Sequence, residues 1–156
     1  MPNAPVPAAA PGLPNHRRAI SRQVVAKSRP EIVFADFASI PDVYAMHLKG
    51  TCLEPQLMDG DEVVFTSAEP PKPGEFAIFI LRPELVSPGG SQSMIKRLVL
   101  APPPHVTFPW REHPKSEVHA VVVAEQLNPA RQFWIRCDRL LAIHRFVRVQ
   151  NRQVRT

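Results

Sequence analysis

The chain has 156 residues, of which 44% are hydrophobic and 21% charged, which fits one domain with a packed core and excludes a wholly disordered chain. Its net charge of +5 is uneven: residues 1–30 and 139–156 each carry five basic and no acidic residues, whereas residues 31–138 carry 9 basic and 14 acidic residues. A basic nucleic-acid-binding core is therefore disfavoured, and a longest apolar run of six residues is far too short to cross a membrane.

Residues 1–14 contain five prolines and no charged residue, a composition typical of a flexible leader. Asn15 can cap a short helix that continues to about Lys27, and Pro30 would end it. One short helix is too little for a three-helix DNA-binding head. The N-terminus shows no basic stretch followed by an apolar one, so no signal peptide is expected. Residues 1–40 are interpreted as a proline-rich arm or linker.

From residue 40 onward the pattern changes to short β-like runs separated by proline and glycine. Residues 101–114 are rich in proline and are expected to form a long exposed hairpin connection. Strand-length runs without helical patterns between them indicate a mainly β, antiparallel fold for one domain at residues 41–156. The expected strands lie at 43–48, 62–66, 76–81, 94–100, 118–124 and 140–149.

The segment around Cys52 has the features of a site. An expected strand runs into Gly50 and a tight turn that presents Cys52, and an Asp-Gly-Asp turn at 59–61 begins the next strand. Such a junction exposes backbone N–H groups beside a side chain, which are the components of an oxyanion hole. The alternative interpretation is a buried structural thiol. Two cysteines do not make a disulfide framework, so a cytoplasmic location is expected, and neither they nor the six histidines have metal-ligand spacing.

Lys96 lies in the middle of the expected strand 94–100, whose side chains alternate between two faces. One face therefore carries Lys96 and the other Arg97, each among apolar neighbours. One interpretation is an edge strand whose long cations reach water. The other is a desolvated lysine, because burial disfavours the charged form of an amine.

Together these motifs resemble the LexA-type peptidase superfamily, which includes LexA, phage repressors and UmuD-like proteins and has the type I signal peptidases as relatives. The family pattern is Gly-x-Ser-Met-x-Pro, then Asp-Gly-Asp, then a strand ending in Lys-Arg. This chain has Gly-Thr-Cys-Leu-Glu-Pro at 50–55, Asp-Gly-Asp at 59–61 and Ile-Lys-Arg-Leu at 95–98. Residues 127–129 resemble the family's Asn-Pro turn and residues 141–147 its closing strand. The resemblance implies a coiled antiparallel β-sheet.

The resemblance also implies roles. Cys52 stands where the family has its serine nucleophile, and Lys96, 44 positions later, stands where it has its lysine general base. The residues that would form the oxyanion hole or shape the turn are Gly50, Thr51, Leu53, Pro55 and Asp61. For the glycine, the proline and the aspartate, a purely structural role is the alternative.

A thiol in place of a hydroxyl changes the proton balance. Reference pKa values of about 8.5 for a cysteine thiol and about 10.4 for a lysine ammonium favour the proton on the amine by roughly 2.6 kcal/mol. Desolvation opposes the resulting ion pair. A thiolate–ammonium dyad with lysine as general acid would retain nucleophilic chemistry, whereas the larger sulfur in a tight oxyanion hole would abolish it.

Two further departures from the family concern the cleavage site and the arrangement of domains. Family members that cut themselves do so at an Ala-Gly or Cys-Gly bond, but none of the six glycines here follows alanine or cysteine. The candidate bond near the leader is Pro11–Gly12, where proline constrains the geometry. The second departure is the missing DNA-binding head, which leaves a layout like that of UmuD: an arm followed by a β domain.

Two functions are therefore expected as the main alternatives, and a nucleic-acid-associated regulator that uses the basic ends is a third. The first is a LexA-like (self-)peptidase or regulatory domain that uses the Cys–Lys dyad to cleave peptide bonds in a stress-response (SOS) or phage-repressor-like transcriptional context. The second is a catalytically inactive LexA-like module for dimerisation and partner binding. Either is expected to be a homodimer joined through the closing strand, with a regulatory protein partner, no membrane and no cofactor. DNA contact is expected to be indirect or weak, through the basic ends.

Overall fold

The computed structural model describes residues 32–110 and 120–151. In these ranges seven strands form one antiparallel sheet, which confirms the expected mainly β fold. None of the helices in the same ranges has the length and apolarity that crossing a membrane requires. The strands are β1 (Val43–His47), β2 (Glu62–Thr66), β3 (Phe76–Leu81), β4 (Ser93–Leu100), β5 (Val121–Leu127), β6 (Ala130–Arg136) and β7 (Leu140–Asn151). The short 3-10 helices are η1 (Phe37–Ser39), η2 (Pro83–Leu85) and η4 (Cys137–Arg139).

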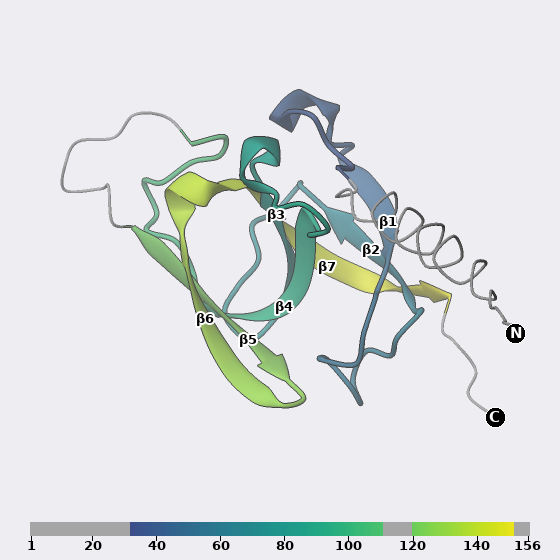
Figure 1. The fold of residues 1–156 in the computed structure, drawn as a ribbon. Coiled ribbons are helices and arrows are strands. Elements are labelled where there is room, and N and C mark those ends of the chain that lie inside the picture. Colours follow the sequence, from purple (N-terminus) through teal and green to yellow (C-terminus); the bar gives the residue numbers. More distant parts are fainter. Residues whose placement is uncertain (1–31, 111–119, 152–156) are drawn as a thin grey trace, which may run out of the picture.

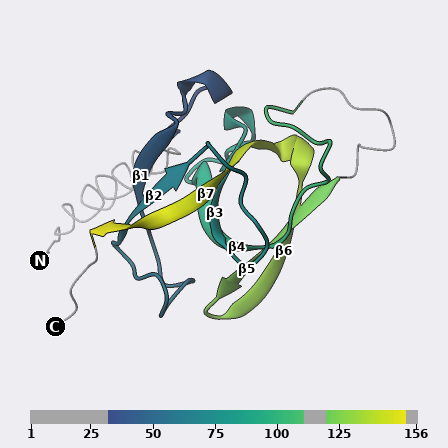
Figure 2. The same cartoon turned by 180° about the vertical axis from the view of Figure 1, so that it is seen from behind.

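The strands are ordered β1-β2-β7-β3-β4-β5-β6. The long strand β7 joins the two halves of the sheet, because its first residues pair with β3 and its last residues with β2. Figures 1 and 2 show a strongly twisted sheet with β1 and β2 at one end and the β5–β6 hairpin at the other. The strand of Lys96 lies between β3 and β5, so its interpretation as an edge strand is wrong.

Strand β3 carries buried side chains on both faces, which explains its continuous apolar sequence. Ile78 and Ile80 pack in one buried cluster, whereas Ala77 and Phe79 pack in another. This alternation follows from the two-residue period of a strand. The first cluster also contains Leu53, so the turn that carries the candidate nucleophile is anchored in the core of the domain.

The expected strands at 43–48, 62–66, 76–81, 94–100 and 140–149 are present within about two residues of their bounds. The strand expected at 118–124 is observed, where described, as β5, which extends to Leu127. Strand β6 was not expected at all. It forms an edge of the sheet and most of its residues are exposed, so its sequence lacks the apolar alternation that marks a strand.

The proline-rich connection does join the paired strands β4 and β5, as expected. The expectation that it is exposed holds only in part for its described residues, 101–110, of which Pro104, His105 and Thr107 are exposed. Val106 is buried, and Phe108 and Trp110 pack against the second cluster. These apolar residues explain the difference, because they cover a face of the sheet that would otherwise meet water.

The leader and the helix expected at 15–27 lie outside the described residues. Of the expected arm, residues 32–40 are described, and they already contact the sheet domain. The buried side chain of Gln92 accepts hydrogen bonds from the N–H groups of Val33 at 3.0 Å and Phe34 at 2.8 Å, and it donates to the Phe34 carbonyl at 2.7 Å. The packed part of the chain therefore begins no later than Val33, and the boundary at residue 40 stays a prediction.

A partly buried tyrosine–histidine pair makes the stability of this fold depend on pH. The Tyr44 hydroxyl on β1 lies 2.9 Å from His144 Nδ1 on β7. Burial lowers the pKa of His144 below its ordinary value of 6.5, although nearby Asp42 acts in the opposite direction. The unfolded chain therefore binds a proton at a pH where the folded chain does not. The contribution of His144 to stability is therefore complete above pH 6.5 and is lost as the pH falls below that value.

We expect the free energy of unfolding to fall by up to about 1.4 kcal/mol per pH unit on this account between about pH 7 and pH 5. Thermal melts at several pH values measure the effect, and His144→Gln is the comparison because it cannot take up the proton. The melting temperature of this variant should depend less on pH. Parallel pH curves for the two proteins would contradict the assignment.

Candidate active site

Cys52 is carried by a loop between β1 and β2 whose base is closed by hydrogen bonds. The N–H of Leu48 donates to the carbonyl of Asp61 at 2.9 Å. Gly50 has a φ of +92°, in the left-handed region that glycine tolerates without strain, and its N–H donates to Asp59 Oδ1 at 2.7 Å. The chain therefore changes direction immediately before Cys52, as the sequence predicted.

Two fully buried side chains fix this loop from the inside. Leu53 packs in the first cluster, and Asp61 Oδ2 accepts a hydrogen bond from the N–H of Met58 at 2.8 Å. Because a buried carboxylate is costly without partners, this arrangement ties the far side of the loop to the core. Of the other expected turn residues, Thr51 and Pro55 are exposed.

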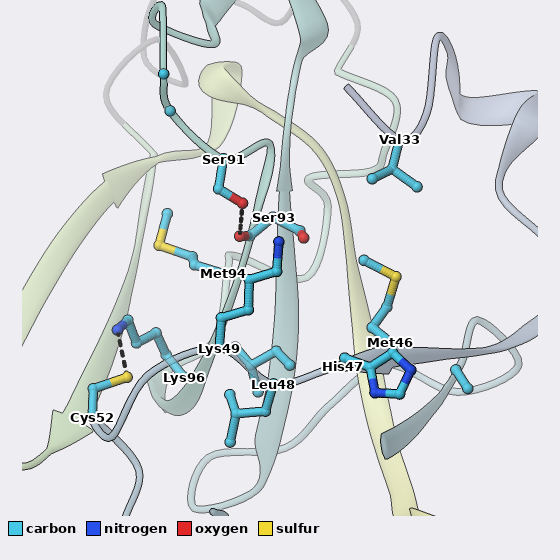
Figure 3. A pocket seen from close by; sticks show the side chains of 14 residues that line it. Val33, Met46, His47, Leu48, Lys49, Cys52, Ser91, Ser93, Met94 and Lys96 are labelled. Atoms are coloured by element: carbon cyan, nitrogen blue, oxygen red, sulfur yellow. Dashed lines mark hydrogen bonds between the residues drawn. The ribbon is translucent and has the colours of Figure 1, made fainter. Parts of the chain in front are cut away.

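Lys96 reaches the candidate nucleophile from β4. Its Nζ donates to Cys52 Sγ at 3.2 Å, and Figure 3 shows the two side chains pointing toward each other. The same nitrogen donates to Gln126 Oε1 on β5 at 3.3 Å and lies 5.2 Å from the ring centroid of Phe133 on β6. Three adjacent strands therefore surround the ammonium group. The structure thus brings the two residues of the expected dyad within hydrogen-bond distance.

The β5–β6 hairpin also contacts the loop of Cys52 directly. The carbonyl of Cys52 accepts hydrogen bonds from the N–H groups of Leu127 at 2.7 Å and Asn128 at 3.0 Å. Gln126 Nε2 donates to the carbonyl of Pro129 at 3.0 Å, which leaves the amide oxygen of this glutamine facing the lysine. The expected Asn-Pro turn is therefore part of the candidate site and holds the backbone of Cys52 in place.

The backbone around Cys52 offers donors for an oxyanion. In the part of the chain that the structure describes, the N–H groups of Thr51, Cys52 and Leu53 have no hydrogen-bond acceptor. An acyl-transfer site needs such donors where negative charge develops on the substrate oxygen. These three N–H groups belong to Cys52 and its two neighbours in the chain, which makes them the candidates for this task.

A cleft of about 700 Å³ opens beside the dyad, between β1 and β4. Figure 3 shows Met46 and His47 from β1 on one side and Met94 from β4 on the other, with Val33 near the far end. The cleft is therefore partly apolar, with polar groups at intervals. Strand β1 forms an edge of the sheet, so one side of its backbone has no strand partner among the described residues.

The second cysteine has different surroundings. Cys137 is fully buried in the second cluster, and burial, with Asp138 acting in the same direction, raises its pKa to about 11. Such a thiol stays protonated and unreactive near neutral pH. Cys52 is half-buried, borders the cleft and is hydrogen-bonded to an amine. Cys137 thus has the surroundings of a buried structural thiol, whereas Cys52 packs against the first cluster and is only partly buried.

Sequence reasoning missed Gln126 and Phe133. The one signal for Gln126 is its place directly before the Leu-Asn-Pro motif, and nothing in the sequence marks Phe133. Within the described residues, no group of three or more histidine, cysteine, aspartate or glutamate side chains lies close enough to hold a metal ion.

No family model matches the chain, and neither the curated proteins nor the solved structures contain a match. The resemblance to LexA-type peptidases therefore rests on the motifs of the sequence.

Proposed function

We propose that this chain is a LexA-like peptidase or regulatory domain that cleaves peptide bonds with Cys52 as nucleophile and Lys96 as its proton-transfer partner. The proposal rests mainly on the 3.2 Å contact between Lys96 Nζ and Cys52 Sγ beside a cleft. A nucleophile and the group that exchanges its proton must lie within hydrogen-bond reach. The family motifs at 50–55 and 59–61 support the same assignment independently of this distance.

The proposed reaction begins when the thiolate of Cys52 attacks the substrate carbonyl carbon. A carbon–sulfur bond forms, and the carbonyl electron pair moves to the oxygen, where the N–H groups of residues 51–53 stabilise it. As the carbon–nitrogen bond breaks, the ammonium of Lys96 gives its proton to the leaving amine. The now neutral amine of Lys96 then takes a proton from water. The resulting hydroxide hydrolyses the thioester, which restores the thiolate–ammonium pair.

The proposed substrate is an extended peptide that lies in the cleft. The unpaired side of β1 can form main-chain hydrogen bonds with such a peptide. The walls formed by Met46 and Met94 fit apolar side chains. The chain's own N-terminal arm is one candidate, because Val33, which belongs to the expected arm at residues 1–40, lines the same cleft.

The test compares three purified proteins: wild type, Cys52→Ala and the matched control Cys137→Ala. Each is incubated alone and with a library of peptides, and mass spectrometry identifies new chain ends. We expect wild type and Cys137→Ala to produce the same new ends, provided the control still folds, and Cys52→Ala to produce none. New ends that are unchanged in Cys52→Ala would contradict the proposed function.

The second candidate function is a catalytically silent module for dimerisation and partner binding. It is favoured by the absence of an Ala-Gly or Cys-Gly bond and by the cysteine that replaces the family's serine. In the proposed homodimer, the second half of β7 pairs with its copy, because among the described residues this half pairs with β2 alone. A regulatory protein partner in a stress-response or repressor-like setting, in the cytoplasm, belongs to both candidates.

Light scattering over a range of concentrations tests the dimer. We expect the apparent mass to reach that of two chains, and Val147→Arg, at an exposed position in this half of β7, to shift dissociation to higher concentration. A monomer at every concentration would contradict dimerisation and would count heavily against the silent module.

A further inference from the structure

Lys96 Nζ faces three groups: a cysteine sulfur, an amide oxygen and an aromatic ring. They are Cys52 Sγ at 3.2 Å, Gln126 Oε1 at 3.3 Å and the ring of Phe133 at 5.2 Å. An amide oxygen can accept hydrogen bonds but cannot donate them, and the face of an aromatic ring attracts positive charge. Neither therefore offers a proton to the lone pair of a neutral amine, whereas both interact well with an ammonium.

The orientation of Gln126 is fixed by its second hydrogen bond. Its Nε2 donates to the carbonyl of Pro129 at 3.0 Å, so its oxygen must face the lysine. A reversed amide would place its NH₂ group against the ammonium and its oxygen against a carbonyl oxygen, and both contacts would be repulsive. The turn at the end of the β5–β6 hairpin thus presents an acceptor to Lys96.

We propose that Gln126 and Phe133 are positioning residues that hold Lys96 as an ammonium, so that the resting dyad is a thiolate–ammonium pair. The effect of this charge state on peptide cleavage rests on the proposed function. The charge state itself can be measured whether or not the protein cleaves peptides. This arrangement suits a cysteine nucleophile. A serine at position 52 would need a neutral amine to take its proton, so Cys52→Ser should be inactive.

The other charged groups around the dyad do not supply this stabilisation. Arg131 lies 4.9 Å from the ring centroid of Phe133, but it is exposed and screened by solvent. Lys49 lines the same cleft. Arg97 belongs to the opposite face of β4, where it pairs with Glu125 at 2.7 Å. On β3, the residue opposite Lys96 is the uncharged Ala77. Among the described residues, the amide, the ring and the thiolate are the contacts of Lys96 Nζ that favour an ammonium.

The test measures how fast iodoacetamide alkylates Cys52 at a series of pH values, with mass spectrometry to separate Cys52 from Cys137. The full-length variants are Gln126→Leu and Phe133→Leu. Each should shift the midpoint of the pH profile upward by about half a unit to one unit and slow alkylation at neutral pH about 3- to 10-fold. The matched control is Gln132→Leu, an exposed position on the same hairpin, which should leave the profile unchanged.

A residue that only supports the fold would change the melting temperature without moving the midpoint, so both are measured, and either variant suffices if the other does not fold. Midpoints that stay in place, or that move to lower pH, would overturn the proposal. If the midpoints shift as expected but no peptide is cleaved, the charge-state proposal stands and the peptidase assignment fails. If peptides are cleaved while the midpoints stay in place, the reverse holds.

Discussion

Replacing Lys96 by methionine should lower the rate of peptide-bond cleavage by about 10²- to 10⁴-fold, the usual contribution of a general acid or base. Lys96 Nζ donates to Cys52 Sγ at 3.2 Å, and on the proposed mechanism its loss would remove both the charge that supports the thiolate and the proton that the leaving amine needs. Methionine keeps most of the volume of the lysine stem. The melting temperature of the variant, measured alongside kcat/KM, shows whether the fold is retained.

Arg97→Met is the matched control for this experiment. Arg97 is the next residue on β4, but its guanidinium lies on the other face and pairs with Glu125 at 2.7 Å. The control also removes a half-buried cation from the same strand, so it should lower stability modestly while keeping cleavage within a few-fold of wild type. Equal loss of activity in the two variants would contradict the assignment of Lys96 to the dyad.

Truncating Leu53 should cause the largest loss of stability at the site. We expect Leu53→Ala to lower the free energy of unfolding by about 2–5 kcal/mol, because Leu53 is 0% exposed and its loss leaves a cavity in the first cluster. The substitution lies next to Cys52, so it should also slow alkylation of the thiol. Urea denaturation, followed by fluorescence, measures the first effect.

Two leucine variants calibrate this measurement. Leu53→Met, which restores the residue type of the resembled family, conserves volume and should cost less than about 1.5 kcal/mol. Leu100→Ala removes a side chain that is 51% exposed and should change stability by no more than about 0.5 kcal/mol. A cost for Leu53→Ala no greater than that for Leu100→Ala would show that Leu53 does not anchor the loop.

The strands that the sequence predicted well are those whose apolar runs follow a clear turn. Strand β2 follows the Asp-Gly-Asp turn at 59–61 and β3 follows Pro73-Gly74, and both begin and end at the expected residues. Strand β6 could not be predicted in the same way. It lies at the edge of the sheet, and exposed residues such as Arg131 and Trp134 interrupt its pattern.

The candidate site, like the strands, could be predicted from the sequence only in part. Alternation along β4 correctly separated Lys96 from Arg97, but periodicity cannot bring together two residues 44 positions apart. Their proximity was expected only from the family resemblance. Gln126 and Phe133 reach Lys96 because of the register in which β4, β5 and β6 pair, and register depends on the whole sheet. No local pattern carries that information.

On the proposed function, Cys52, activated by Lys96, forms a covalent bond with a substrate acyl group. The most direct measurement mixes the full-length protein with an activated peptide ester, stops the reaction with acid and locates the added mass by peptide mapping. We expect one acyl group on Cys52 in the wild type and far slower acylation in Lys96→Met. Acylation at equal rates in the two proteins, acylation of Cys137 instead, or no acylation of Cys52 would contradict it.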